Sequence, residues 1–229
     1  MIALSWSRIS DYRQCPHKFN MKYLRKEPNF QLKDDEKSPQ LVRGGNVHKG
    51  LDTYVIKKLK YEEPTVTMPE ILRTAPLIDQ IIHNYSVKSE QQIAINDQFQ
   101  VVSWYAKDAW FRVIYDLIGL GNDLLLVDWK TGKFAEYAGS MEELGQLHMA
   151  AVVGMTMYPD YEDCSSVYVY VDHRKTVPCT FKRSEDYEYM RDQLIREHEW
   201  INKDQTFIPR KNQYCRWCDS TFEQCKFKK

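Results

Sequence analysis

Val113-Ile114-Tyr115-Asp116 and Leu125-Leu126-Val127-Asp128-Trp129-Lys130 are the two stretches that decide the fold of this 229-residue chain. Both are rich in β-branched and aromatic residues, which favours strands, and a Gly-Asn pair between them predicts a tight antiparallel turn. Residues two apart in a strand point to the same face, so Asp128 and Lys130 should lie together, with Asp116 beside them on the neighbouring strand.

The two carboxylates indicate a metal site. Carboxylates held close together raise one another's pKa unless a cation lies between them, and Mg2+ is the ion that prefers hard oxygen ligands. Lys130 beside such an ion could orient or deprotonate an attacking water and neutralise charge on a phosphoryl group. The alternative is an ordinary surface ion pair, which the apolar surroundings of Asp128 disfavour because an unpaired buried charge is costly.

Hydrophobic periodicity places these strands within a longer α/β pattern. Residues 61–97 are of mixed character, and residues 27–40 are polar and predict a loop. The order in the middle of the chain is helix, three strands, helix and strand, with helical ends. The predicted helices are 5–26 with a break at Pro16, 46–60, 71–82, 141–158 and 184–203, and the predicted strands are 98–106, 109–120, 123–129 and 166–172.

Four cysteines lie at the two ends of the chain. Cys215, Cys218 and Cys225 are spaced C-x2-C-x6-C, which lets thiolates converge on one metal or cluster, and Cys15 is the obvious fourth ligand. Disulfides are the alternative. Because no apolar signal segment begins the chain, we expect a reducing cytoplasm, where disulfides are rare. The other two cysteines, at 164 and 179, lie in no motif.

The charge is balanced overall but not along the chain. Lys plus Arg and Asp plus Glu both number 32. Residues 8–33 hold seven basic residues against two acidic ones, and residues 205–229 hold six against two. These basic ends suit a surface that follows a phosphate backbone, and they equally suit an ordinary solvated face. No apolar run is long enough to cross a bilayer, so no membrane association is expected.

Taken together, these motifs resemble the PD-(D/E)XK nuclease superfamily. More narrowly, the chain is similar to the RecB-type exonuclease branch with an iron–sulfur cluster, to which the CRISPR adaptation nucleases belong. Each motif alone is a weak signal, whereas six in order along nearly the whole chain are specific. The matching segments are residues 5–16, residues 43–48, Asp116, residues 128–132, Gln146 with Leu147, and the C-terminal cysteines.

The resemblance implies an α/β, restriction-endonuclease-like core of αβββαβ order with a mixed sheet. Helical N- and C-terminal segments would be joined by the cluster. Within a single nuclease domain, residues 1–229, the core would be 41–203 and the cluster-binding ends 1–40 and 204–229.

The resemblance also implies the cofactors and their ligands. Without it, His48 would be interpreted as a surface or capping residue. Ala150 stands where the family usually has a tyrosine, and Glu90 and Arg112 match too loosely to be assigned. The implied roles are a 4Fe–4S cluster on Cys15, Cys215, Cys218 and Cys225, Mg2+ or Mn2+ on His48, Asp116 and Asp128, and catalysis by Asp116, Asp128, Lys130 and a supporting Gln146.

The implied function is a metal-dependent exodeoxyribonuclease that prefers single strands and hydrolyses phosphodiester bonds during DNA processing or recombination. Its substrate would be DNA that is single-stranded or has free ends, in the cytoplasm of a bacterial or phage-infected cell, where a recombination or replication protein could be its partner. One alternative is a site-specific or structure-specific endonuclease, which would normally need base-reading elements. The other is a non-catalytic DNA-binding protein, which the intact Asp116, Asp128 and Lys130 disfavour.

Overall fold

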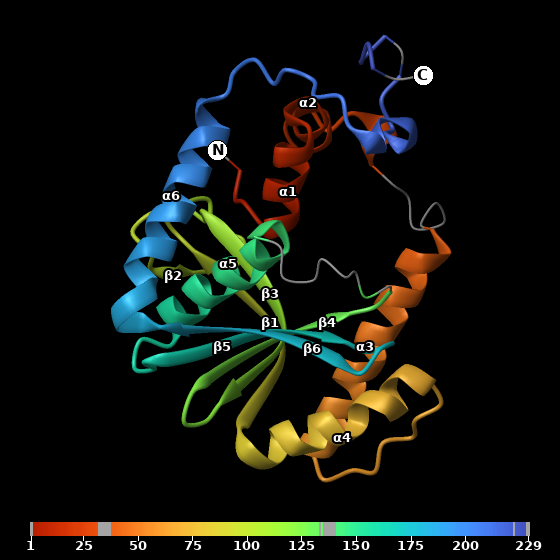
Figure 1. The fold of residues 1–229 in the computed structure, drawn as a ribbon, viewed down its shortest axis with the longest axis vertical. Coiled ribbons are helices and arrows are strands. Elements are labelled where there is room, and N and C mark those ends of the chain that lie inside the picture. The colour runs from red at the N-terminus through yellow and green to blue at the C-terminus, as the bar shows by residue number, and fades with distance from the viewer. Residues whose placement is uncertain (1, 32–37, 133, 135–140, 222, 228–229) are drawn as a thin grey trace. The chain divides into compact units, whose positions relative to one another are not determined.

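A computed structural model describes residues 2–31, 38–132, 134, 141–221 and 223–227 of the chain (Figure 1). The chain forms two compact units. One is Ser38–Asp192, and the other combines Met1–Lys37 with Gln193–Lys229. The division at 192 falls within the last long helix, Glu188–Lys203, and the predicted nuclease core 41–203 stays a prediction.

The unit Ser38–Asp192 is built on a six-stranded mixed sheet of order β2-β1-β3-β4-β5-β6. Neighbouring strands are antiparallel except β4 and β5, which are parallel. A parallel pair needs a crossover, and helix α5 (Met141–Met157) supplies it. The strands are β1 (Ser86–Ile95), β2 (Val101–Val102), β3 (Phe111–Leu120), β4 (Leu124–Lys130), β5 (Asp163–Tyr170) and β6 (Lys175–Lys182).

The predicted α/β class with a mixed sheet is confirmed, but one predicted strand was largely wrong and two strands were not predicted. The predicted strand 98–106 is reduced to the two residues of β2. Strand β1 lies in the segment interpreted as mixed, because only its last three residues are continuously buried. Strand β6 was not predicted, because it is an edge strand with mostly exposed or half-buried side chains and so lacks a regular apolar alternation.

Helices α3 (Pro39–Leu59) and α4 (Pro69–Asn84) cover one face of the sheet. Leu51 of α3 and Ile78 of α4 belong to one buried cluster with Leu117 and Val127 of the sheet. Helix α3 begins seven residues before the predicted start at 46. Ser38 caps it by accepting a hydrogen bond from the backbone of Leu41, and proline occupies the first helical position.

Helix α5 covers the other face of the sheet. The Tyr115 hydroxyl donates to the Ala150 carbonyl at 2.6 Å. A Cβ at Gly154 would lie 2.7 Å from the end of the Leu126 side chain of β4, so a larger residue there would require Leu126 to move. Tyr115 and Leu126 therefore face α5, while Leu117 and Val127 face α3 and α4.

The terminal unit combines α1 (Trp6–Gln14) and α2 (Pro16–Phe19) with the end of α6 (Glu188–Lys203) and a short turn at Gln213–Trp217. The predicted break at Pro16 is confirmed, since proline begins α2. Arg13 donates two hydrogen bonds, of 2.8 and 2.7 Å, to the Glu197 carboxylate. This bidentate pair joins the two ends of the chain to one another.

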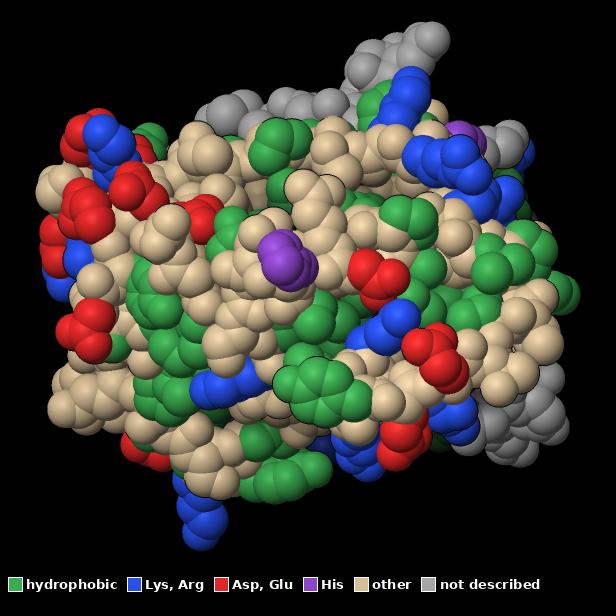
Figure 2. Space-filling view, turned by 90° about the horizontal axis from the view of Figure 1, so that it is seen from below, with side chains coloured by type: hydrophobic (Ala, Val, Ile, Leu, Met, Phe, Trp, Pro, Cys, Tyr) green, Lys and Arg blue, Asp and Glu red, His purple; other side chains and the backbone are tan. Residues whose placement is uncertain are grey.

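Neither unit carries a helix that is long and apolar enough to span a bilayer, among the residues described. On the face shown in Figure 2, Lys and Arg side chains lie among Asp and Glu side chains and patches of apolar surface. With a formal net charge of zero, attraction of a polyanion must depend on local groups and not on the field of the whole protein.

Candidate active site

The site lies where β3 and β4 separate. Their pairing runs from Leu120–Leu124 to Leu117–Val127 and then stops, although β4 continues to Lys130 along β5. Asp116 and Asp128 are the next residues on the two strands. The predicted hairpin is confirmed, and both carboxylates lie at the open end of the fork.

Asp128 and Lys130 lie on the face covered by α5, as strand alternation predicts. Lys130 Nζ lies 2.8 Å from Asp128 Oδ2 and donates to Gln146 Oε1 at 3.0 Å. The Gln146 amide donates to Asp128 Oδ1 at 2.5 Å. The Lys130 ammonium also lies 4.5 Å from the centre of the Tyr168 ring. Gln146 of α5 thus fixes both charged groups through one amide.

One oxygen of the half-buried Asp128 carboxylate, Oδ2, is itself buried and accepts no hydrogen bond from the described residues. Oδ2 contacts Lys130 as an ion pair, but the approach makes no well-directed hydrogen bond, and no other described residue donates to this atom. Burial raises the pKa of Asp128, Lys130 opposes that rise, and Asp116 adds to it. A divalent cation would coordinate this oxygen and lower the pKa of Asp128. The Asp128 carboxylate therefore fits a hard metal ion.

His48 approaches the fork from α3. Its Nδ1 lies 2.9 Å from Asp116 Oδ1, and the other Asp116 oxygen accepts from the backbone amide of Trp129 at 2.7 Å. The hydrogen bond with Asp116 raises the pKa of His48, against the opposing effect of burial. A metal ion at this position would compete with that proton for the imidazole nitrogen.

Glu90 of β1 completes a compact group that the sequence did not assign. The ligand atoms of His48, Glu90 and Asp116 all lie within 4.8 Å of one another. Burial raises the pKa of Glu90, and the charges of Asp116 and Asp52 raise it further. Two carboxylates and one imidazole form a donor set suited to Mg2+ or Mn2+. Asp128 is outside this group, so its place among the metal ligands stays a prediction.

A local break in β1 brings these groups together. Glu90 has a φ of +49°, although it lies in the middle of a strand. The pairs Ser89–Leu117 and Gln91–Tyr115 form on either side of it, whereas Glu90 and Asp116 between them do not pair. A non-glycine residue in this region costs of order 1–3 kcal/mol, and such strain collects at functional sites.

The break also changes the face of the sheet on which the side chains of β1 and β3 lie. Ser89 donates to Asp52 of α3 at 2.5 Å, and the next residue, Glu90, groups with His48 of the same helix. On β3, Asp116 contacts His48, and the following Leu117 packs into the α3 core cluster. With regular alternation, Asp116 and Leu117 would lie on opposite faces of the sheet. The interruption therefore directs both carboxylates toward His48.

An open groove surrounds the group. At its wall, Gly44 lets α3 approach the loop after β4, since a Cβ there would lie 3.1 Å from Thr131 Oγ1. The groove is lined by the three metal-binding candidates and by Ser38, Gln40, Leu41, Gly44, Gly45, Ile114 and Thr131.

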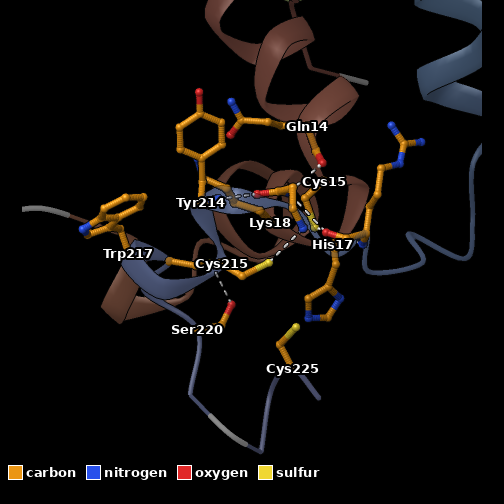
Figure 3. A pocket seen from close by; sticks show the side chains of 12 residues that line it. Gln14, Cys15, His17, Lys18, Tyr214, Cys215, Trp217, Ser220 and Cys225 are labelled. Atoms are coloured by element: carbon orange, nitrogen blue, oxygen red, sulfur yellow. Dashed lines mark hydrogen bonds between the residues drawn. The ribbon is translucent and has the colours of Figure 1, made fainter. Parts of the chain in front are cut away.

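A separate cleft of about 200 Å³ lies within the terminal unit and is lined by Cys15, Cys215, Cys218 and Cys225 (Figure 3). All four cysteine side chains are partly exposed. Backbone amides of Arg210 and Asn212 donate to the sulfurs of Cys15 and Cys215, at 3.4 and 3.3 Å. The structure thus brings the four predicted cysteines to one cleft, and the cluster itself stays a prediction.

The comparison with known families decides where the chain belongs. The family model described as the PD-(D/E)XK nuclease superfamily matches residues 3–225. The chain belongs to this superfamily. As a PD-(D/E)XK protein it is a metal-dependent phosphodiester hydrolase, in agreement with the close group of His48, Glu90 and Asp116.

Of two further comparisons, one found no match and the other shows a shared fold alone. No curated protein sequence matches the chain. Among solved structures, that of SSO0001 is similar with a TM-score of 0.51 and 16% sequence identity, covering 100% of this chain and 88% of that chain. At such low identity the similarity shows a shared fold.

Replacing Glu90 tests the metal group. We expect Glu90→Gln to weaken Mn2+ binding by at least about tenfold, because it removes one carboxylate ligand, and loss of a group that merely supports a ligand already costs about 10- to 100-fold. Glu90→Gly should weaken binding equally while preserving the unusual backbone, since glycine adopts positive φ without cost. Calorimetric titration with Mn2+ measures both. Wild-type affinity in the two variants would show that Glu90 is not a ligand.

Proposed function

We propose that the protein is a metal-dependent exodeoxyribonuclease that prefers single-stranded DNA. The observation that supports catalysis is the arrangement at the fork. His48, Glu90 and Asp116 form a donor set on one side, and the ammonium of Lys130 is held on the other side by Asp128 and Gln146. A cation site and a fixed ammonium on the two sides of one strand fork supply the electrostatic groups that phosphodiester hydrolysis needs.

Each residue would have a distinct task. Bound Mg2+ or Mn2+ would act as a Lewis acid toward the phosphoryl oxygens and lower the pKa of a water. Lys130 would position the attacking water and stabilise the negative charge that grows on the phosphoryl group. Gln146 would keep Lys130 in place, because it contacts both Lys130 and Asp128. Asp128 would hold the Lys130 ammonium in position through their ion pair.

The cysteine cleft would hold a 4Fe–4S cluster. Four thiolates suit either a cluster or a single zinc ion. A zinc ion, with Zn–S distances of about 2.3 Å, requires the sulfurs to be closely grouped. The four cysteines, all of them described, do not form such a compact group, whereas His48, Glu90 and Asp116 do. The donated backbone hydrogen bonds also suit cluster sulfurs. A reducing cytoplasm would preserve these thiols.

The preference for single strands rests on the surface of the terminal unit. Tyr214 and Trp217 are 47% and 62% exposed, and their rings point away from the Cys215 sulfur (Figure 3). The Arg216 guanidinium lies 3.6 Å from the centre of the Trp217 ring. Exposed aromatic rings beside cationic groups stack on unpaired bases and contact phosphates. A recombination or replication protein as partner belongs to the same proposal.

Linear and covalently closed circular single strands provide the decisive substrates. With Mn2+ or Mg2+, we expect the wild-type protein to degrade an end-labelled linear strand completely and to leave closed circles of the same sequence intact, because an exonuclease needs an end. Gel analysis of a time course measures both. Equal degradation of circles and linear strands would instead establish an endonuclease, provided that Lys130→Met has no activity on either substrate.

A further inference from the structure

Strand β3 carries a row of side chains that extends away from the metal group. Phe111 and Tyr115 are buried on the face toward α5, so Arg112, Ile114 and Asp116 share the opposite face. Ile114 lines the same groove as His48 and Asp116 and is 50% exposed. The face of β3 that lines the groove at Ile114 and Asp116 therefore continues to Arg112, which lies beyond the residues that line the groove itself.

Arg112 is a cation without a carboxylate partner among the described residues. Its Nε–H is buried and donates no hydrogen bond to a described residue, whereas Arg43 of the same unit makes ion pairs with Glu70 and Asp172. The guanidinium lies 5.5 Å from the centre of the Trp104 ring. Trp104 restricts the position of this cation without neutralising its charge.

We propose that Arg112 binds a phosphate of the substrate strand next to the scissile phosphate, so that the strand lies along the row Asp116, Ile114 and Arg112. This inference rests on the proposed nuclease function. At about 3.3 Å per residue, Arg112 and Asp116 are separated by roughly 13 Å along the strand, which is too far for one phosphate to contact both. A guanidinium with unused N–H donors matches phosphate oxygens, and the half-exposed Ile114 offers an apolar surface to the intervening sugar or base.

The salt dependence of DNA binding tests this assignment. In a Lys130→Met background, which prevents cleavage, fluorescence anisotropy of a labelled single strand gives the dissociation constant at several salt concentrations. Loss of one phosphate contact lowers the slope of log K against log salt by about 0.7. We expect Arg112→Gln to show this decrease together with roughly tenfold weaker binding, as for the loss of one charged hydrogen bond.

A control and a second measurement keep the test independent of folding. Lys182→Gln removes the same charge from β6, at the other edge of the sheet, and should leave slope and affinity unchanged. In a second measurement, each phosphate of the strand is replaced in turn by a neutral methylphosphonate. One replacement, away from the scissile phosphate, should weaken binding by the protein that retains Arg112 about tenfold and should not change binding by the Arg112→Gln variant.

The outcomes separate this inference from the proposed function. An unchanged slope and affinity for Arg112→Gln, or a scan in which no single position depends on Arg112, overturns the role of Arg112 even if the wild-type protein cuts DNA. A wild-type protein that neither binds nor cuts DNA with Mn2+ instead overturns the proposed nuclease function.

Discussion

Lys130→Met should abolish DNA cleavage and leave the fold intact. Methionine keeps an apolar stem next to Tyr168 but removes the ammonium that contacts Asp128 and Gln146. Removal of one preorganised electrostatic group typically lowers the rate by about 10²–10³-fold. Single-turnover cleavage of an end-labelled strand with Mn2+ measures the rate, and circular dichroism verifies the fold.

Two comparisons give this prediction its specificity. Lys182→Met changes an exposed lysine of β6 and should cut DNA at the wild-type rate. Asp116→Asn should also lose cleavage, but together with Mn2+ affinity, because Asp116 belongs to the metal group and Lys130 does not. Cleavage by Lys130→Met at the wild-type rate would show that its ammonium takes no part in the reaction.

Cys15→Ser should prevent binding of the proposed 4Fe–4S cluster and destabilise the terminal unit. We expect wild-type protein purified without oxygen to contain about four iron atoms per chain, as a 4Fe–4S cluster requires. Cys15 lies in the N-terminal segment and the other three cysteines lie at the C-terminus, so loss of one ligand removes the bridge between the two ends. Bound structural metals can supply several kcal/mol of folding free energy. Iron analysis and thermal melting measure both effects.

The matched control for this prediction is Cys179→Ser, which changes a half-buried cysteine of β6 outside the cleft. It should keep the full iron content and the wild-type melting temperature. Stoichiometric zinc with negligible iron in the wild-type protein would reject the cluster, and full metal content in Cys15→Ser would show that Cys15 is not a ligand.

The sequence by itself determined the features that depend on near neighbours along the chain. The alternation in 125–130 places Asp128 and Lys130 on one face, and their 2.8 Å contact confirms it. The Gly-Asn turn fixes the β3–β4 hairpin, and Pro16 fixes the break between α1 and α2. Each of these features depends on the two-residue alternation of side chains in a strand or on a residue whose backbone dihedral angles are unusual. No contact with a distant part of the chain is needed to predict them.

Only the tertiary structure decided how the site is completed. Glu90 reaches His48 because its backbone leaves the regular strand conformation, and no local pattern in a polar segment indicates a positive φ there. Likewise, Arg112 shares a face with Asp116 only because the alternation of β3 is regular up to Asp116, and it breaks at Leu117, which packs toward α3 as Asp116 does. These features arise from pairing between strands distant in sequence, where packing against α3 offsets a local strain that the isolated segment would avoid.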